Sequence, residues 1–264
     1  MENEMAIRLM IFLGLFTLLA LAEVFLPRRK RDIKRSPRWF TNISLIIIDS
    51  FTIRLMAFIL PVMAVTAAAD ADAHAWGLLG LINWPNWVEV MITILILDFV
   101  IWTQHLITHK IPILWRLHQV HHADRDMDVT TAIRFHPIEI ALSMILKIGM
   151  IYALGPTAFA VILFEILLNG TAMFNHANIR LPKKLDQVIR LLIVTPDMHR
   201  VHHSHNREEH DSNYGFSLSI WDRLFGTYVA QPAKGHDDMT IGLGWQGENP
   251  QKLSWCLLLP FYNK

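Results

Sequence analysis

The sequence predicts an all-α integral membrane protein with about four to five transmembrane helices and a histidine-rich helical cap on the cytosolic side. Three observations indicate this fold class. Apolar residues make up 53% of the 264 residues and charged residues only 18%, whereas about 25% of an ordinary soluble domain is charged. The mean hydropathy is +0.32, and long apolar runs recur along the chain. Ten of the 14 histidines lie between residues 105 and 203.

The first expected span covers residues 5–26, enough to cross ~30 Å of hydrocarbon at about 20 residues. A cleaved signal peptide is the alternative, but the basic cluster follows this apolar run instead of preceding it. That cluster, residues 28–38, contains seven basic residues and one acidic residue. Such segments stay on the cytoplasmic side of a membrane. The net charge of +1 for the whole chain gives no argument for nucleic-acid binding.

Two further spans are expected before the main histidine motifs. Residues 43–69 lead outward, and residues 88–107 return the chain to the cytoplasm. The loop between them, residues 70–87, is acidic, and no lysine or arginine occurs from residue 55 to residue 109. The distribution of positive charge therefore places this loop outside.

A last apolar stretch, residues 138–174, is broken by Gly155 and Pro156. Each half has about 17 residues, the lower limit for a span, so we expect a helical hairpin that crosses the membrane out and back. Residues 180–264 are more polar and are expected to lie on or under the membrane. With no linker or repeat in the sequence, residues 1–264 are expected to form a single domain.

Three histidine motifs repeat a helical spacing: His105-x-x-x-His109, His118-x-x-His121-His122 and His199-x-x-His202-His203. Residues three or four apart share one face of a helix, so each motif directs its imidazoles to one side. Eight imidazoles suffice for two metal ions with three or four ligands each. His136 and His176 are candidates for further ligands. Imidazole suits zinc, copper, iron and nickel, and paired metals suit either O2 activation or hydrolysis.

Asp98 lies in the middle of an expected span, where a carboxylate is a functional candidate by default. It shares one helical face with His105 and His109. We therefore expect Asp98 to accept the second N–H of a metal-ligating imidazole. A hydrogen bond between helices is the alternative role for this carboxylate.

Four other residues are expected to take no part in the chemistry. Cys256 is the only cysteine, which excludes an intrachain disulfide, and its apolar neighbours indicate a buried, inert thiol. His205, His210 and His236 lie in polar segments and are interpreted as surface residues rather than ligands.

These motifs resemble the fatty acid hydroxylase/sterol desaturase superfamily of membrane di-iron enzymes. The resemblance extends in order over about half of the chain and is closest to the branch that contains alkylglycerol monooxygenase. Besides the first motif, the segments that carry it include Trp115-Arg116-Leu117-His118-Gln119-Val120-His121-His122, Arg134-Phe135-His136-Pro137, Asn175-His176-Ala177-Asn178, Asp197-Met198-His199-Arg200-Val201-His202-His203, Asn213-Tyr214-Gly215 and Leu224-Phe225-Gly226-Thr227.

The resemblance implies two iron ions, with zinc as a possible substitute, in a cytosolic cap above the membrane helices. The implied ligands are His105, His109, His118, His121, His122, His199, His202 and His203, with His136 and His176 matching additional family histidines. It also implies O2-dependent hydroxylation or desaturation of a lipid C–H bond. The electrons would come from a separate ferredoxin, cytochrome or reductase.

Two other functions remain open from the residues alone. A zinc-dependent membrane hydrolase would need a general base beside a metal-bound water, and the sequence has no His-Glu-x-x-His motif. A membrane metal-binding or transport protein would spread its ligands along the spans, whereas here the histidines gather at one side. We expect a multi-pass protein of a bacterial inner membrane with its active site on the cytoplasmic side.

Overall fold

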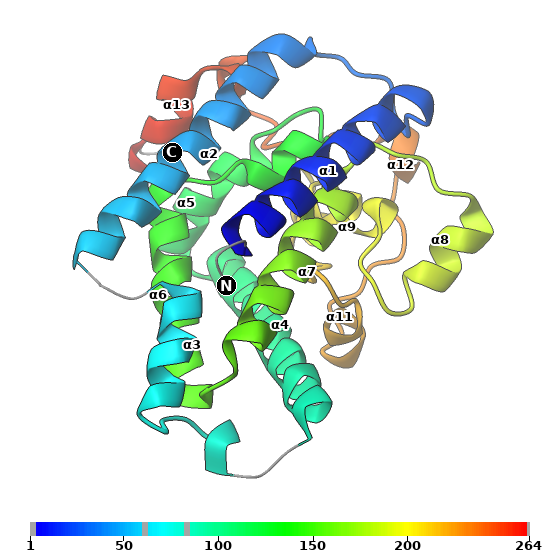
Figure 1. Cartoon of the computed structure of the whole chain (residues 1–264). Helices are drawn as coiled ribbons and strands as arrows, with labels where there is room; N and C mark the ends of the chain where they lie inside the picture. Colours follow the sequence, from blue (N-terminus) through cyan, green and yellow to red (C-terminus); the bar gives the residue numbers. More distant parts are fainter. Residues whose placement is uncertain (1–3, 60–62, 82–84, 263–264) are drawn as a thin grey trace.

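The computed structural model describes residues 4–59, 63–81 and 85–262, and within these ranges its regular structure is entirely helical, without a β-strand (Figure 1). Five of the described helices are long and apolar enough to cross a membrane. They are α1 (Glu4–Phe25), α2 (Arg35–Ile59), α4 (Asn86–Lys110), α6 (Pro137–Leu154) and α7 (Ala158–His176). The prediction of an all-α membrane protein with four to five spans is confirmed.

Shorter elements join the spans and cover one end of the bundle. Between α2 and α4 these are α3 (Ala64–Ala73) and η1 (Leu79–Leu81). Between α4 and α6 they are α5 (Pro112–His122) and η2 (Val129–Ile133). After the last span they are α8 (Lys183–Ile189), α9 (Pro196–His202), α10 (Arg207–His210), α11 (Ile220–Leu224), α12 (Gly235–Asp238), η3 (Asn249–Gln251), α13 (Leu253–Leu258) and η4 (Leu259–Phe261). Figure 1 shows α8 standing out at the side of the molecule.

The expected second span, residues 43–69, is wrong in its bounds. α2 begins inside the basic cluster, and α3 is a separate helix of 10 residues. Residues 60–62 lie outside the described residues, and the sequence has Pro61 there, which lacks the N–H that a continuing helix needs. α3 packs an alanine face against α6. Its small side chains let the two helices approach closely, as membrane helices commonly do.

The predicted hairpin is confirmed as α6 and α7, with the break at the expected place. Gly155 ends α6 in the left-handed conformation, with φ of 63°. A Cβ atom built on Gly155 would lie 2.1 Å from the carbonyl oxygen of Trp76, so only glycine fits. The turn of the hairpin is therefore packed directly against the chain that follows α3.

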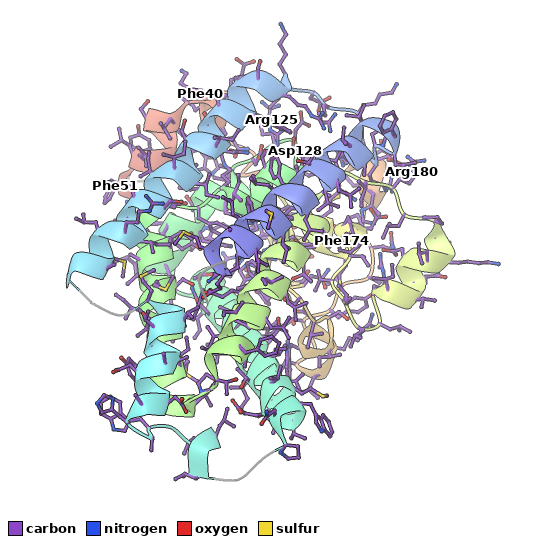
Figure 2. All side chains as sticks on the ribbon, in the orientation of Figure 1. Phe40, Phe51, Arg125, Asp128, Phe174 and Arg180 are labelled. Carbon is purple, nitrogen blue, oxygen red and sulfur yellow. The ribbon has the colours of Figure 1, made fainter. Side chains whose placement is uncertain are left out.

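Apolar side chains cover the outside of the spans. Only 6% of the most apolar 18-residue stretch of α1 is buried inside the molecule. Phe40 and Phe51 on α2 point away from the bundle in Figure 2 and are 69% and 67% exposed. A soluble protein rarely exposes so much contiguous apolar surface, so this surface fits contact with lipid.

Buried ion pairs hold the basic cluster against the end of α5. The Arg38 guanidinium donates to Asp124 Oδ1 (2.7 Å) and Oδ2 (2.9 Å), and also to Asp128 Oδ2 (2.9 Å). All three side chains are buried. Glu23, at the end of α1, is also buried and pairs with Arg31 and Arg35 of the same cluster. The basic cluster thus lies at the end of the bundle where α5 presents its histidines.

Candidate metal centre

Four helices converge at this end and bring nine histidines together. α4 supplies two of them from its last turns, and α5 follows α4 after a single residue, Ile111. α7 ends at His176, while α9 and the residue after it supply the last motif. α4 packs on both α5 and α7, and α7 packs on α9. The three sequence motifs therefore meet although they are far apart along the chain.

The nine histidines form two groups, within each of which one ring nitrogen per member lies within 4.8 Å of the others. The five-histidine group consists of His105, His109, His118, His122 and His202. The four-histidine group consists of His121, His176, His199 and His203. All nine side chains are buried, and the most exposed of them, His109, is only 6% exposed.

In five of these rings, Nδ1 lies beside an oxygen that can only accept a hydrogen bond. The ring proton of these five histidines is therefore on Nδ1. The pairs, with Nδ1-to-oxygen distances, are His105 with the Tyr214 carbonyl (2.7 Å), His118 with Glu139 Oε1 (2.6 Å), His121 with the Arg134 carbonyl (3.2 Å), His176 with the Ala172 carbonyl (2.7 Å) and His202 with the Ser212 carbonyl (2.7 Å). Each Nδ1 donates to its oxygen, so the Nε2 of a neutral ring keeps its lone pair.

Several of these Nε2 lone pairs face one another. Nε2 of His105 lies 3.0 Å from Nε2 of His118. Nε2 of His176 lies 3.1 Å from Nε2 of His121, and it also lies 3.1 Å from Nε2 of His199, a ring whose Nδ1 has no hydrogen-bond partner among the described residues. Facing lone pairs repel each other in a buried site and are stabilised when a cation lies among them. Unpaired buried nitrogens of this kind are costly in a protein that carries no ligand.

Burial also keeps five of the grouped imidazoles neutral. In the members outside the membrane-spanning helices, burial first and neighbouring imidazoles second lower the pKa well below its usual value. These members are His121, His122, His199, His202 and His203. Neutral imidazole is the form that binds a metal ion. The residues present therefore fit histidine-ligated metal ions.

Two of the predicted site residues lie apart from both groups. His136 caps α6, where its Nδ1 accepts from the Ile138 N–H at 3.2 Å and its Nε2 lies 3.2 Å from the Leu257 carbonyl. Asp98 does not contact an imidazole but accepts from Trp221 Nε1 at 2.8 Å. Asp98 and the first histidine of α4 are seven residues apart, about 10 Å along a helix, which is too far for a carboxylate to reach.

Glu139 takes the role that was expected of Asp98, and two other carboxylates, Asp211 and Asp222, lie close to the five-histidine group. Glu139 accepts from His118, and Asp211 Oδ1 lies 3.5 Å from Nδ1 of His109. Asp222 accepts from the N–H of Tyr214 and so holds the carbonyl that binds His105. Sequence reasoning did not assign these roles. An acidic residue in the first turn of an apolar span is a signal that could have indicated Glu139.

One surface assignment from the sequence, that of His236, is also wrong. His236 is buried, because α12 packs it beside α9, and its pKa falls to about 4 through burial. His210 is half-buried beside His109, with 5.9 Å between their ring centroids. His205 is exposed and Cys256 is buried, as expected.

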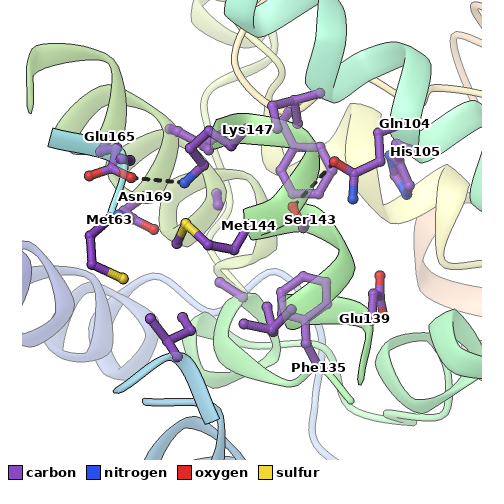
Figure 3. A pocket seen from close by; sticks show the side chains of 18 of the residues that line it. Met63, Gln104, His105, Phe135, Glu139, Ser143, Met144, Lys147, Glu165 and Asn169 are labelled. Atoms are coloured by element: carbon purple, nitrogen blue, oxygen red, sulfur yellow. Dashed lines mark hydrogen bonds and ion pairs between the residues drawn. The ribbon is translucent and has the colours of Figure 1, made fainter. Parts of the chain in front are cut away.

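A cavity of about 480 Å³ reaches the five-histidine group from the membrane-spanning helices. His105, His118 and Glu139 line it, and Figure 3 shows His105 and Glu139 at one side. The ion pair between Lys147 Nζ and Glu165 Oε1, 2.8 Å long, lies at the other side. Apolar side chains lie between these two sides, among them Ile101, Phe135, Ile140, Met144 and Leu168.

Comparisons with known proteins agree with this site. The chain is 28% identical to ornithine lipid hydroxylase OlsE of Rhizobium tropici over 88% of this chain and 70% of that protein. It is 34% identical to alkylglycerol monooxygenase of Xenopus tropicalis over 57% of this chain, and 33% identical to the human enzyme over 52%. The chain spans only about a third of the length of these monooxygenases. No solved structure matches the chain.

The matched family model, described as fatty acid hydroxylase, covers residues 90–227, which is half of the chain. This range includes all nine grouped histidines and the carboxylates of Glu139, Asp211 and Asp222. The family and the relatives named above are oxidoreductases by their described activities. The chain thus belongs to the fatty acid hydroxylase family.

Proposed function

We propose that this protein hydroxylates, or desaturates, a lipid C–H bond with O2 at two histidine-ligated iron ions. The observation that carries the proposal is the pair of buried histidine groups, one of which lines a largely apolar cavity. We assign one metal ion to each group. His136, which the sequence also suggested as a ligand, is left out because its ring caps α6.

When bound, the iron ions would supply the O2 activation and electron-transfer chemistry that side chains lack. This chain's own residues orient the site. Acceptors on Nδ1 hold five rings with Nε2 turned inward, and Glu139 orients His118 through their 2.6 Å hydrogen bond. Burial excludes water, which protects an oxidising site from side reactions.

The cavity supports a lipid as substrate. Apolar side chains line its middle, and it connects the spans with His105 and His118. A hydrocarbon chain in this space would bring an unactivated carbon beside the five-histidine group. Hydroxylation by O2 consumes two electrons in addition to those of the C–H bond and releases water. We therefore include an external donor, such as a ferredoxin, cytochrome or reductase, in the proposal.

We further propose that the site faces the cytoplasm of a bacterium, in its inner membrane, and that residues 1–264 act as one domain. The basic cluster supports the orientation, since positive segments remain cytoplasmic and Arg38 pairs with Asp124, two residues after His122. The relative that covers 88% of the chain comes from the bacterium Rhizobium tropici.

The test joins metal content with product formation. Protein from iron-supplemented cells, purified in detergent, should contain about two irons per chain. With O2, a reducing system and lipid extract, it should produce lipids heavier by one oxygen or lighter by two hydrogens. The His121→Ala variant should lose iron and turnover, whereas His205→Ala, which changes an exposed histidine, should retain both.

Two results would contradict the proposal. The first is full turnover in the His121→Ala protein. The second is stoichiometric zinc that iron cannot replace without loss of function, which would favour a metal-dependent hydrolase. Zinc that iron displaces with a gain of activity would instead agree with the proposal, because it would indicate incorrect metal loading during expression.

A further inference from the structure

We propose that His210 and Asp211 form a transit site through which a divalent metal ion passes to His109 and then into the five-histidine group. The inference rests on the proposed function only in requiring that the buried histidines bind metal. It assigns a role to two residues that lie outside both groups. The ligand is a hydrated divalent transition-metal ion, for which imidazole and carboxylate are suitable ligands.

The geometry provides a third set of possible metal ligands. His109, His210 and Asp211 each offer an atom within 4.8 Å of the others, and His109 is at the same time a member of the five-histidine group. Asp211 Oδ1 lies 3.5 Å from Nδ1 of His109, which leaves Nε2 of that ring for the five-histidine group. His109 therefore connects the two sets.

The burial of these residues indicates that a metal ion would move from His210 and Asp211 inward to His109. His210 and Asp211 are half-buried, while all nine grouped histidines are buried. His109 makes no hydrogen bond through either ring nitrogen among the described residues. A metal ion arriving from solvent can thus meet His210 and Asp211 before it meets His109, whose ring nitrogens are available to receive it.

The surrounding side chains hold His210 in place. The indole ring of Trp115 stacks on the His210 ring, with centroids 5.1 Å apart and planes 14° apart. The same indole contacts His109 at a centroid distance of 4.8 Å and His122 at 5.2 Å. Trp115 therefore lies along one side of the path from His210 to the five-histidine group.

A transit site must release its ion, and the charges around Asp211 favour release. Lys110 Nζ lies 2.9 Å from Asp211 Oδ2, and Arg207 Nε lies 3.7 Å from the same oxygen. These cations share the negative charge of the carboxylate and weaken its attraction for a metal ion. The five-histidine group has more ligands, and no described lysine or arginine side chain forms an ion pair with it, so the ion should move inward.

The experiment measures the rate of metal uptake, which is independent of turnover. Protein in detergent is stripped with a chelator and mixed with Co²⁺, whose visible absorption reports binding in real time. The variant is His210→Ala, and the control is His205→Ala, which removes an exposed histidine nearby. Because it loses one of three transit ligands, we expect His210→Ala to load about tenfold more slowly, with the final number of bound ions unchanged. His205→Ala should load at the wild-type rate.

A second variant, Asp211→Asn, keeps the size of the side chain and should also slow uptake. Loading of His210→Ala at the wild-type rate would overturn the inference. A lower final stoichiometry in His210→Ala would also overturn it, since His210 would then be a resident ligand. If the wild-type protein bound no Co²⁺ or Fe²⁺ at all, the proposed function itself would fail. Equal rates in wild type and variants would leave that function intact.

Discussion

The two histidine groups share α5 and α9, but α4 contributes only to the five-histidine group and α7 only to the four-histidine group, and their surroundings also differ. The five-histidine group lines the cavity through His105 and His118, and carboxylates lie beside two of its rings. In the four-histidine group, His121 and His176 donate to backbone carbonyls, and no member of the group lines the cavity.

With one metal ion in each group, as proposed, this difference predicts different roles for the two ions. A carboxylate that accepts from the ring nitrogen not used for the metal makes an imidazole a stronger ligand. Such a carboxylate can be replaced by mutation, whereas a backbone carbonyl cannot be replaced in this way. The five-histidine group lies where substrate and incoming metal would arrive, and the four-histidine group lies enclosed behind it. We expect the two groups to respond differently to substitutions around them.

The largest effect should come from removing one ligand from each group in turn. His202→Ala in the five-histidine group and His199→Ala in the four-histidine group should each lower bound iron from about two ions to about one per chain. Both should abolish turnover, because each removes a ligand from a proposed two-metal site. Metal analysis together with product detection checks this. Loss of both ions in either variant would show that the groups are one cooperative site.

Removing Arg38 should destabilise the fold and affect both groups alike. Arg38→Met leaves the buried carboxylates of Asp124 and Asp128 without their cation, and breaking a buried pair typically costs about 3–5 kcal/mol. Thermal unfolding in detergent should therefore shift strongly downward. The control, Arg125→Met, removes an exposed arginine whose guanidinium donates to the Gly247 carbonyl, and it should unfold near wild type. Equal shifts in both variants would contradict the importance of the buried network.

Glu139→Gln should affect the five-histidine group alone. The amide keeps the shape of the side chain but removes the charge that accepts from His118 Nδ1. Loss of such a partner typically lowers metal affinity or activity by about 10–100-fold. Chelator titration should show one ion held more weakly and the other unchanged. Glu208→Gln, at an exposed position, is the matched control. An equal loss of affinity for both ions would contradict the view that the two groups bind metal separately.

The smallest effect concerns His236, a buried histidine outside both groups. Burial lowers its pKa to about 4, so the folded protein keeps it neutral while the unfolded chain takes up a proton below about pH 6.5. Stability should therefore fall as the pH drops from 6.5 towards 4. His236→Gln should reduce this loss by about 2 kcal/mol at pH 5. The measurement is the unfolding temperature of wild type and variant at pH 7 and at pH 5. An equal fall in unfolding temperature in both proteins would argue against this role of His236.

Local spacing explains why the sequence predicted the histidine motifs so well. His118 and His122 are one helical turn apart, and the helix alone places them on one face. The same argument failed for Asp98, because its distance from the histidines along α4 exceeds the reach of its side chain. His136 matched a motif, yet its position before Pro137 at the start of α6 makes it a helix cap.

Tertiary contacts determined what the sequence could not predict. Glu139 reaches His118 only after α6 has packed against α5, and Asp211, which directly follows α10, approaches His109 only after α10 has packed against α9. The break between α2 and α3 was missed because the apolar composition continues through it. Composition predicts how much of the chain lies in the membrane, but it does not show that α3 is a separate helix packed against α6 and α7.

α5 acts as a spacer of fixed length between the two groups. This helix of 11 residues gives His118 and His122 to one group and His121 to the other. Since each residue advances about 1.5 Å along a helix and turns about 100° around it, the offset between the groups is set by helical geometry. One residue inserted between His118 and His121 would turn these rings away from each other by that angle. The relative placement of the two groups therefore depends on the number of residues between His118 and His121.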